Sequence, residues 1–421
     1  MAKIQKDRPT VLIIATLDTK LDETRYLRSQ ISGYGIDAII MDCGVLEESP
    51  LLDDCLVDIC SNEVAEAGGD NRKTLVRSGD KAKCIATMIK GVQELTTDLF
   101  SQGKFQSIIG IGGAQGTEIG TAAMRVIPFG VPKLMVSTIA NGLTTFGPYV
   151  GTKDIMIMHS VSDLQGLNYL TKRILDNAAA AIAGMTIAFI KEDLPTVVGI
   201  PVAMSMLGTT TPGALYAKEL LEKAGFQVVA FHQNGTGGIA MEDMIRNGFF
   251  KGVLDINLHE IGDLVGGGLH RAIREYRLES AGMMGLPQVV APGSINYAVW
   301  GTLSTLTPAQ RERKHIVHNQ NLTLVRLTAQ ELINAGQMTA QKLNRAKGPV
   351  HIFIPLRGFS FPDREGLPHW EPEGNQIFID SLKNNLDRRI SLEELDAHIN
   401  DQAFIRPVVE RFLNLMKESG V

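Results

Sequence analysis

An apolar stretch that runs directly into a glycine-rich loop is the feature that most constrains the fold of this chain. Residues 108–120 read IIGIGGAQGTEIG, in which isoleucines of strand character lead into closely spaced glycines and then into a helix-like segment. Glycine lets the backbone approach a ligand closely, and a helix N-terminus offers unpaired N–H groups and a partial positive charge. This order of elements therefore predicts a site for an anion, most often a phosphate group or a nucleotide.

The rest of the chain alternates strand-like and helix-like segments. Strands are expected at 10–15, 37–42, 107–111, 133–137, 154–158, 196–204, 227–232, 252–258, 288–293 and 350–356, with helices between them. Such alternation indicates βαβ crossovers and mainly parallel sheets. We expect an α/β fold with two Rossmann-like domains, residues 1–192 and 193–421, whose sheets face each other across a cleft. The loop at 191–195 is the expected boundary.

Composition narrows the class of protein. The chain has 421 residues, of which 44% are hydrophobic and 21% are charged, which is typical of a globular protein. Its net charge is −5 and it has no dense run of Lys and Arg, so nucleic acid is not an expected partner. No leader peptide and no long apolar run is apparent, which predicts a cytoplasmic location and no membrane partner. The four cysteines form no CxxC pair and are expected to be small apolar filler.

Ligands of open α/β sheets bind at the carboxyl ends of the strands. This rule singles out five loops, at 17–20, 112–117, 137–152, 207–213 and 234–238. The glycine loop is not a P-loop, because Thr117 and not lysine follows the last glycine, and Gln115 breaks the GxGxxG spacing. A purely structural tight turn is the alternative to anion binding.

Several charged side chains near strand ends are candidates for chemistry. Asp18 either ligates Mg²⁺ or caps the following helix, and Lys20 would neutralise a phosphate. In the second half, Asp255, His259 and Glu260 lie at a strand end, where a carboxylate and an imidazole suit acid–base catalysis or metal binding.

The second half, like the first, has loops rich in threonine and glycine before its expected helices. Three threonines at 209–211 precede a proline at a helix start, and Thr-Gly-Gly at 236–238 precedes the next helix. These loops form either a second anion site or ordinary βα turns with an N-cap. His315 and His318 are three residues apart, which would place both on one face of a helix; without a third ligand, a solvated surface is favoured.

Longer motifs resemble a known family. TLDTK at 16–20, GIGGAQGT at 110–117, NAAAAIAGM at 177–185 and MLGTTTPG at 206–213 occur in order. Over nearly its whole length the chain is thus similar to the Tm-one-like ATP-binding domain family. This is a largely uncharacterised, mostly bacterial group similar to the N-terminal region of the tomato mosaic virus resistance protein. The resemblance implies two α/β domains, binding of ATP and Mg²⁺, and a homodimer.

The resemblance also implies which residues hold the nucleotide. In this chain they are Asp18, Thr19, Lys20, Gly112, Gly113, Gln115, Gly116, Thr117, Ser137, Thr138, Gly151 and Thr152. We therefore expect an ATP-binding protein in which Asp18 is the metal ligand. The alternative is a small-molecule metabolic enzyme that acts on a phosphorylated or carboxylated substrate in the cleft between the domains. Its acid–base groups would be Asp255, His259 and Glu260.

Overall fold

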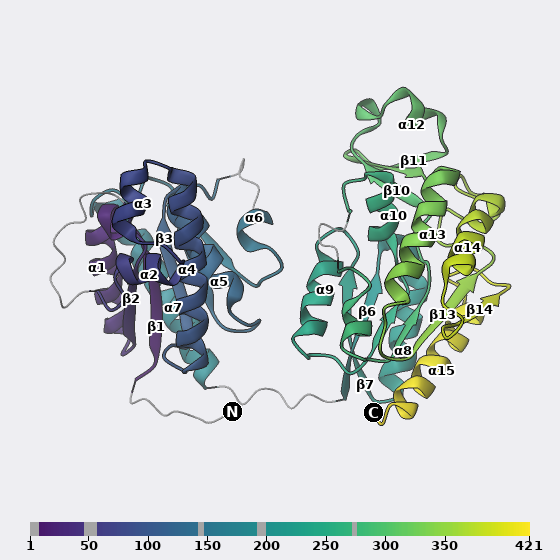
Figure 1. The fold of residues 1–421 in the computed structure, drawn as a ribbon, viewed down its shortest axis with the longest axis horizontal. Coiled ribbons are helices and arrows are strands. Elements are labelled where there is room, and N and C mark those ends of the chain that lie inside the picture. The colour runs from purple at the N-terminus through teal and green to yellow at the C-terminus, as the bar shows by residue number, and fades with distance from the viewer. Residues whose placement is uncertain (1–7, 46–56, 142–146, 192–198, 272–275) are drawn as a thin grey trace. The chain divides into compact units, whose positions relative to one another are not determined.

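The computed structural model describes residues 8–45, 57–141, 147–191, 199–271 and 276–421. The chain folds into two compact units, Met1–Asp193 and Leu194–Val421 (Figure 1). Most of the expected boundary loop at 191–195 lies outside the described residues. Each unit is built around a parallel sheet flanked by helices, which confirms the predicted α/β class. The cleft between the units stays a prediction.

The first unit holds a five-stranded parallel sheet in the order β2-β1-β3-β4-β5. Its strands are β1 (Thr10–Ala15), β2 (Asp37–Asp42), β3 (Ser107–Gly112), β4 (Lys133–Ser137) and β5 (Met156–His159). Its helices are α1 (Leu17–Gly33), α2 (Ser61–Ala67), α3 (Arg72–Ser78), α4 (Lys81–Ser101), α5 (Ala114–Val126), α6 (Gly147–Val150) and α7 (Tyr169–Ile190).

Apolar side chains alternate across this sheet and form a core on each face. Val11 and Ile13 of β1 belong to the core that includes α1 and α7, whereas Leu12 and Ile14 belong to the core that includes α4 and α5. Because both faces of β1 are covered, the strand is apolar throughout. Cys43 is buried in the second core, as expected for apolar filler. Cys55 lies outside the described residues.

Helix α7 is long and apolar enough to span a membrane by length and composition, with a mean hydropathy of 1.4. In the structure it packs on β3, β4 and α1, and one of its faces is buried in the core of the first unit. We therefore assign α7 as a core helix of the first unit.

The second unit holds a six-stranded parallel sheet in the order β14-β13-β9-β8-β6-β7. Its strands are β6 (Ile200–Met206), β7 (Phe226–His232), β8 (Val253–Asp255), β9 (Gln288–Val290), β13 (Val350–Pro355) and β14 (Ser391–Leu395). Its helices are η1 (Gly208–Thr210), α8 (Thr211–Lys223), α9 (Gly237–Arg246), α10 (His259–Gly266), α11 (Ser280–Met283), η2 (Leu303–Thr305), α12 (Pro308–Glu312), α13 (Ala329–Leu343), α14 (Pro372–Asn385) and α15 (Gln402–Glu418).

A small antiparallel sheet, which the sequence did not predict, extends from this unit near α12 (Figure 1). It consists of β10 (Tyr297–Trp300), β12 (Leu322–Arg326) and β11 (His315–Asn319), in that order. The helical interpretation of His315 and His318 is therefore wrong. His318 lies at a register irregularity of β11, between Val317 and Asn319, and has no paired partner among the described residues of β12.

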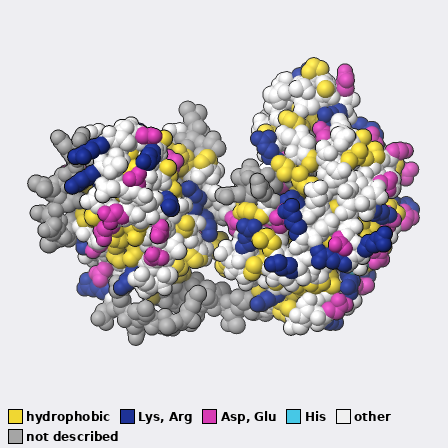
Figure 2. All heavy atoms as spheres, in the orientation of Figure 1, with side chains coloured by type: hydrophobic (Ala, Val, Ile, Leu, Met, Phe, Trp, Pro, Cys, Tyr) yellow, Lys and Arg dark blue, Asp and Glu magenta, His cyan; other side chains and the backbone are white. Residues whose placement is uncertain are grey.

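Charges of both signs occur on the visible face of each unit (Figure 2). This mixture is what 41 basic and 46 acidic residues would produce when they are dispersed along the chain.

Candidate functional site

The two parallel sheets share a strand order that places a ligand site in each. In both, the first strand of the unit lies between the second and the third. The connections from the first and third strands therefore leave toward opposite faces of the sheet, and proteins with this order bind ligands at the carboxyl ends of those strands. The candidate sites are the ends of β1 and β3 in the first unit, and of β6 and β8 in the second.

In the first unit, the glycine loop after β3 turns tightly into α5. A Cβ on Gly112 would lie 2.7 Å from the Cα of Gly116, so this turn requires glycine. Gly113 is the N-cap residue of α5, and none of the described side chains caps the helix there. Gly113 and Gln115 are half-buried and Ala114 is exposed, so a ligand can approach the first turn of the helix.

Hydroxyl groups at the end of β4 lie beside this loop. A Cβ on Gly113 would lie 3.7 Å from Thr138 Oγ1, and the hydroxyls of Thr117 and Ser137 are 2.7 Å apart. Thr138 is half-buried, whereas Thr117 and Ser137 are buried and fix the loop to the strand. The structure thus brings together the predicted residues of loop 112–117 and those at the end of β4.

The loop after β1 also lies beside the glycine loop. A Cβ on Gly116 would lie 3.9 Å from Thr16 Oγ1, which is 3.2 Å from the hydroxyl of the exposed Thr19. Lys20 is buried and its Nζ donates to the Thr19 carbonyl at 3.4 Å. The helix is interrupted at Lys20, with φ −128° and ψ 27°. Thr19 and Lys20 therefore lie on a local irregularity of α1 next to the glycine loop.

Asp18 turns toward the end of β2. Its Oδ2 accepts a hydrogen bond from the Val45 N–H at 2.9 Å. A Cβ on Gly44 would lie 2.9 Å from the Asp18 carboxyl carbon and 3.1 Å from Asp42 Oδ1, so the two carboxyl groups flank this glycine. Burial raises the pKa of Asp42, and the charge of Asp18 adds to this shift. Across the described ranges, no three or more His, Cys, Asp or Glu residues gather as a metal site.

Gly151 and Thr152 do not lie in this cluster. They precede β5 and so belong to the amino end of the sheet, whereas the ligand rule concerns loops that follow strands. A Cβ on Gly151 would lie 3.3 Å from Cδ of Arg125, which donates to the carbonyls of Pro148 and Tyr149. Arg125 is in the last turn of α5, about 16 Å along the helix axis from its start.

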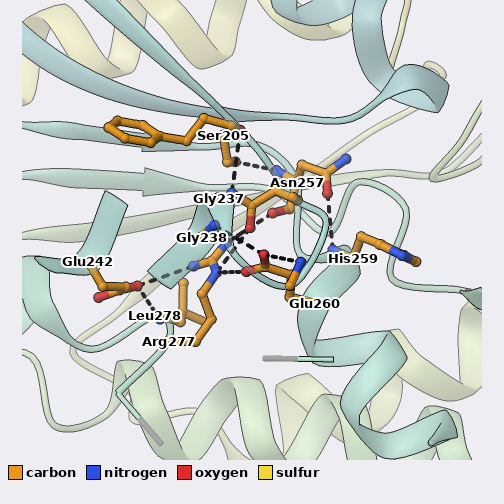
Figure 3. Close-up of polar contacts among 12 residues, drawn as sticks. Ser205, Gly237, Gly238, Glu242, Asn257, His259, Glu260, Arg277 and Leu278 are labelled. Carbon is orange, nitrogen blue, oxygen red and sulfur yellow. Dashed lines mark hydrogen bonds and ion pairs between the residues drawn. The ribbon is translucent and has the colours of Figure 1, made fainter. Parts of the chain in front are cut away.

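In the second unit, N–H groups of the loop before α9 and of its first turn bind a side-chain carboxylate of the same chain, that of Glu260. The N–H group of Gly235 donates to Glu260 Oε1 at 2.8 Å, and that of Gly238 donates to the same oxygen at 3.1 Å. Gly238 and Glu260 are labelled in Figure 3. A Cβ on Gly238 would lie 1.7 Å from Glu260 Oε2, so this carboxylate requires glycine there. The N-terminus of α8 is also closed, because Asn400 Oδ1 accepts from the Gly213 N–H at 3.1 Å. At both helix starts that suggested a second anion site, side-chain oxygens of the chain thus accept from backbone N–H groups.

Arg277 is buried at the centre of this arrangement (Figure 3). Its Nη1 and Nη2 donate to the two Asp255 oxygens at 2.6 and 3.0 Å, and its Nε donates to Glu260 Oε2 at 3.0 Å. Glu242 Oε1 and Gln233 Oε1 accept further bonds at 3.3 and 2.7 Å. Burial opposes the charge on Arg277, but the carboxylates outweigh burial and raise its pKa. Asp255 and Glu260 are therefore engaged in a buried ion-pair cluster.

His259 points away from the Glu260 carboxylate (Figure 3). Its Nδ1 is 3.3 Å from the Ser294 carbonyl oxygen, its Nε2 is 3.5 Å from Asp263 Oδ1, and its ring centroid is 4.8 Å from that of Tyr297. Burial lowers the pKa of His259 to about 3 and raises that of Asp263 to about 7. The imidazole is therefore neutral at pH 7. The structure separates the predicted catalytic histidine from the two predicted carboxylates.

Sequence reasoning missed Arg277 and Tyr297, which lie in no motif with a characteristic spacing. It also missed Asp263, although the i,i+4 spacing from His259 could have indicated that the two side chains share a helix face. Arg277 contacts Gln233 and Glu260 across 44 and 17 positions of the chain. Only the tertiary fold brings these residues together.

Comparison with known proteins identifies the family on both units. The N-terminal domain of an uncharacterised protein family (UPF0261) matches residues 9–191, and the C-terminal domain of the same family matches residues 200–416. A UPF0261 protein of Clostridium tetani is 38% identical over 411 residues, which cover 97% of this chain and 99% of that protein.

Two further likenesses are more distant. The ToMV susceptible protein tm-1(GCR26) of Solanum lycopersicum is 32% identical over the whole of this chain, which spans 57% of the tomato protein. The UDP-GlcNAc 2-epimerase of Methanocaldococcus jannaschii is 10% identical, with 67% of this chain and 83% of that chain covered. Its TM-score of 0.21 is too low to carry an argument.

The matches to both domains, together with the bacterial and tomato relatives, confirm the predicted Tm-one-like resemblance. The chain belongs to the uncharacterised protein family UPF0261.

Proposed function

We propose that the first unit binds ATP with Mg²⁺ at the carboxyl ends of β1 and β3. The observation that carries the proposal is the contrast between two glycine-rich helix starts. The start of α9 is neutralised by the Glu260 carboxylate, whereas α5 receives no cap from the described side chains. An exposed helix N-terminus at this position of an α/β sheet suits a phosphate group.

The residues at this site fit the parts of a nucleotide phosphate. The N–H groups in the first turn of α5 would hold phosphate oxygens. The Thr138 hydroxyl lies beside Gly113, and the exposed Thr19 hydroxyl is 3.2 Å from that of Thr16, next to Gly116. Mg²⁺ is usually held by one or two carboxylates together with phosphates, a role that Asp18 can serve without further protein ligands. The bound metal would neutralise phosphate charge.

Calorimetric titration with ATP, with and without Mg²⁺, tests the proposal on protein freed of co-purifying nucleotide. The informative pair of variants is Gly113→Asp and Gly113→Asn. Gly113 has φ −78°, which any residue adopts, and the nearest atom to an added Cβ is 3.7 Å away, so a Cβ is accommodated there. The pair has nearly the same shape and differs in one charge.

We expect Gly113→Asp to weaken ATP binding far more than Gly113→Asn. A unit negative charge about 5 Å from a phosphate charge costs about 3 kcal/mol at an effective dielectric constant near 20, or about two orders of magnitude in affinity. Affinities for both variants equal to that of the unaltered chain, with circular dichroism unchanged, would place the nucleotide elsewhere. Absence of saturable ATP binding to the unaltered chain would refute the proposal outright.

The family resemblance also supports the proposal of a homodimer, and a cytoplasmic location is proposed beside it. Light scattering over a concentration series tests the first, and cell fractionation tests the second. The alternative enzyme function gains no support from Asp255 and Glu260, because both are bound to Arg277.

A further inference from the structure

We propose that the second unit has a separate binding site for an uncharged, mainly apolar small molecule that carries one hydroxyl group, in the pocket at the end of β6. The pocket has a volume of about 460 Å³, within the range of small-molecule sites. It lies at the carboxyl end of the first strand of the sheet, where the strand order predicts a ligand. Nothing in this inference depends on nucleotide binding by the first unit.

The walls of the pocket are apolar and come from two parts of the chain. Ile316 and Val317 of β11, with Leu324 of β12, form one wall. Phe361 and Leu367, from the segment after β13, form another. Val317 and Phe361 are 52% and 60% exposed, which is unusual for large apolar side chains and leaves apolar surface available to a ligand.

Thr209 supplies a polar group to this apolar surface. It is half-buried, and its backbone carbonyl is fixed by the N–H of Phe361 at 2.9 Å and by Asn400 Nδ2 at 3.0 Å. Its hydroxyl is 2.7 Å from Ser294 Oγ and 2.8 Å from the Tyr297 hydroxyl. The side chain is therefore held in one orientation by contacts on both its backbone and its hydroxyl.

The hydroxyl network behind Thr209 is buried and strongly constrained. Ser294 and Tyr297 are 0% and 1% exposed, and Asn257 Nδ2 donates to Ser294 Oγ at 3.1 Å. Ser294 has φ 56°, a conformation that costs energy for a residue other than glycine and occurs often at functional sites. Burial raises the pKa of Tyr297 to about 12, so its phenol keeps its proton. Of the three hydroxyl-bearing residues, Thr209 is the one that lines the described pocket, and a hydroxyl can donate to a ligand or accept from it, which matches an alcohol or a phenol.

The charges of the residues that line the pocket disfavour an anionic ligand. No Asp, Glu, Lys or Arg lines the described pocket, and His318 is its one titratable side chain. A carboxylate or phosphate would lose its hydration there without gaining a cation, which is unfavourable. The ligand is therefore neutral and differs in class from the nucleotide proposed for the first unit.

The test uses p-cresol, p-xylene and p-toluate as probes of the full-length chain, with titrations followed by ligand-detected NMR at pH 7. The three probes share a toluene skeleton and differ in bearing a hydroxyl, a methyl or a carboxylate group. We expect p-cresol to bind saturably and about five- to tenfold more tightly than p-xylene, through one added hydrogen bond. Binding of p-toluate should be weaker than that of either neutral probe.

Matched variants locate the site. Phe361→Ala should weaken p-cresol binding by at least about fivefold through lost apolar contact, whereas Phe249→Ala, at a 40% exposed phenylalanine outside the pocket, should not. Thr209→Val should abolish the preference for p-cresol over p-xylene, and Thr209→Ser should retain it. The proposal is overturned if p-cresol does not saturate, if p-toluate binds as tightly as p-cresol, or if Phe361→Ala has no effect.

Discussion

Replacing Arg277 with methionine removes a cation from between three carboxylates while keeping a long unbranched side chain. Asp255, Glu260 and Glu242 are each no more than 2% exposed and all bond to this guanidinium. Even with Arg277 present, burial raises the pKa of Glu242 and of Glu260. Without it, the carboxyl groups would keep their protons in the folded state to avoid unpaired buried charge.

The expected loss of stability is large. Breaking a buried ion pair by removing one partner costs about 3–5 kcal/mol. Keeping these buried carboxyl groups protonated in the folded state adds to this cost, because they ionise in the unfolded chain at pH 7. An ordinary domain is stable by only about 5–15 kcal/mol, so the loss is a large share of the whole. We therefore expect Arg277→Met to destabilise the second unit by at least about 4 kcal/mol at pH 7.

The sign of the pH dependence provides a second test. A carboxyl with a raised folded pKa binds more protons in the folded state than in the unfolded state at intermediate pH. Its contribution to stability is therefore present below pH 4 and is lost as the pH rises through the folded pKa, by about 1.4 kcal/mol per pH unit for each group. The Arg277→Met variant should be more stable at pH 5 than at pH 7, with a steeper dependence than the unaltered chain.

Tryptophan fluorescence during urea unfolding measures the stability of the second unit in the intact chain. Both tryptophans, Trp300 and Trp370, belong to the second unit, so the signal reports that unit. The control is Arg357→Met, which breaks an exposed ion pair with Asp396 and should change stability by no more than about 0.5 kcal/mol. A change below about 1 kcal/mol in Arg277→Met at pH 7, or stability that increases from pH 5 to pH 7, would refute the reasoning.

Three further substitutions test the packing of helix ends and interiors. Asn400→Ala leaves the Gly213 N–H without its acceptor and should destabilise the second unit by about 1–2 kcal/mol in the same urea assay. Gly238→Ala forces a methyl group against the Glu260 carboxylate and should cost about 2–3 kcal/mol, measured likewise. Gly184→Ala, at an exposed position inside α7 with no neighbouring atom within 4 Å, should stabilise the first unit by about 0.5–1 kcal/mol in thermal unfolding followed by circular dichroism.

Elements whose own residues form a characteristic pattern were predicted well. The expected strands at 10–15, 37–42 and 133–137 coincide with β1, β2 and β4, because each is an apolar run that ends at turn or polar residues. The glycine loop at 112–117 was found for the same reason, since a close approach of backbone segments can be read from glycine itself.

Features that depend on distant parts of the chain were not predictable. The segment around His315 is charged and half-buried, so nothing in its pattern distinguishes a strand at the edge of a small sheet from a surface helix. Gly151 and Thr152 were assigned to the nucleotide site by the resemblance alone, although the strand expected at 154–158 already put them before a strand, as β5 does in the structure. The role of Glu260 as an internal anion depends on its ion pair with Arg277, and no pattern in the sequence predicts that these two residues pair.

The capping of α9 by Glu260 has a thermodynamic consequence for how the two units respond to their surroundings. A carboxylate attached to the same chain has a fixed effective concentration at its acceptor, so this contact is the same in a dilute buffer and in a cell. A soluble anion at α5 would instead stabilise the first unit by an amount that increases with the logarithm of its concentration. The two helix starts occupy comparable places in their units, yet only that of α5 would couple the stability of its unit to the supply of an anionic metabolite.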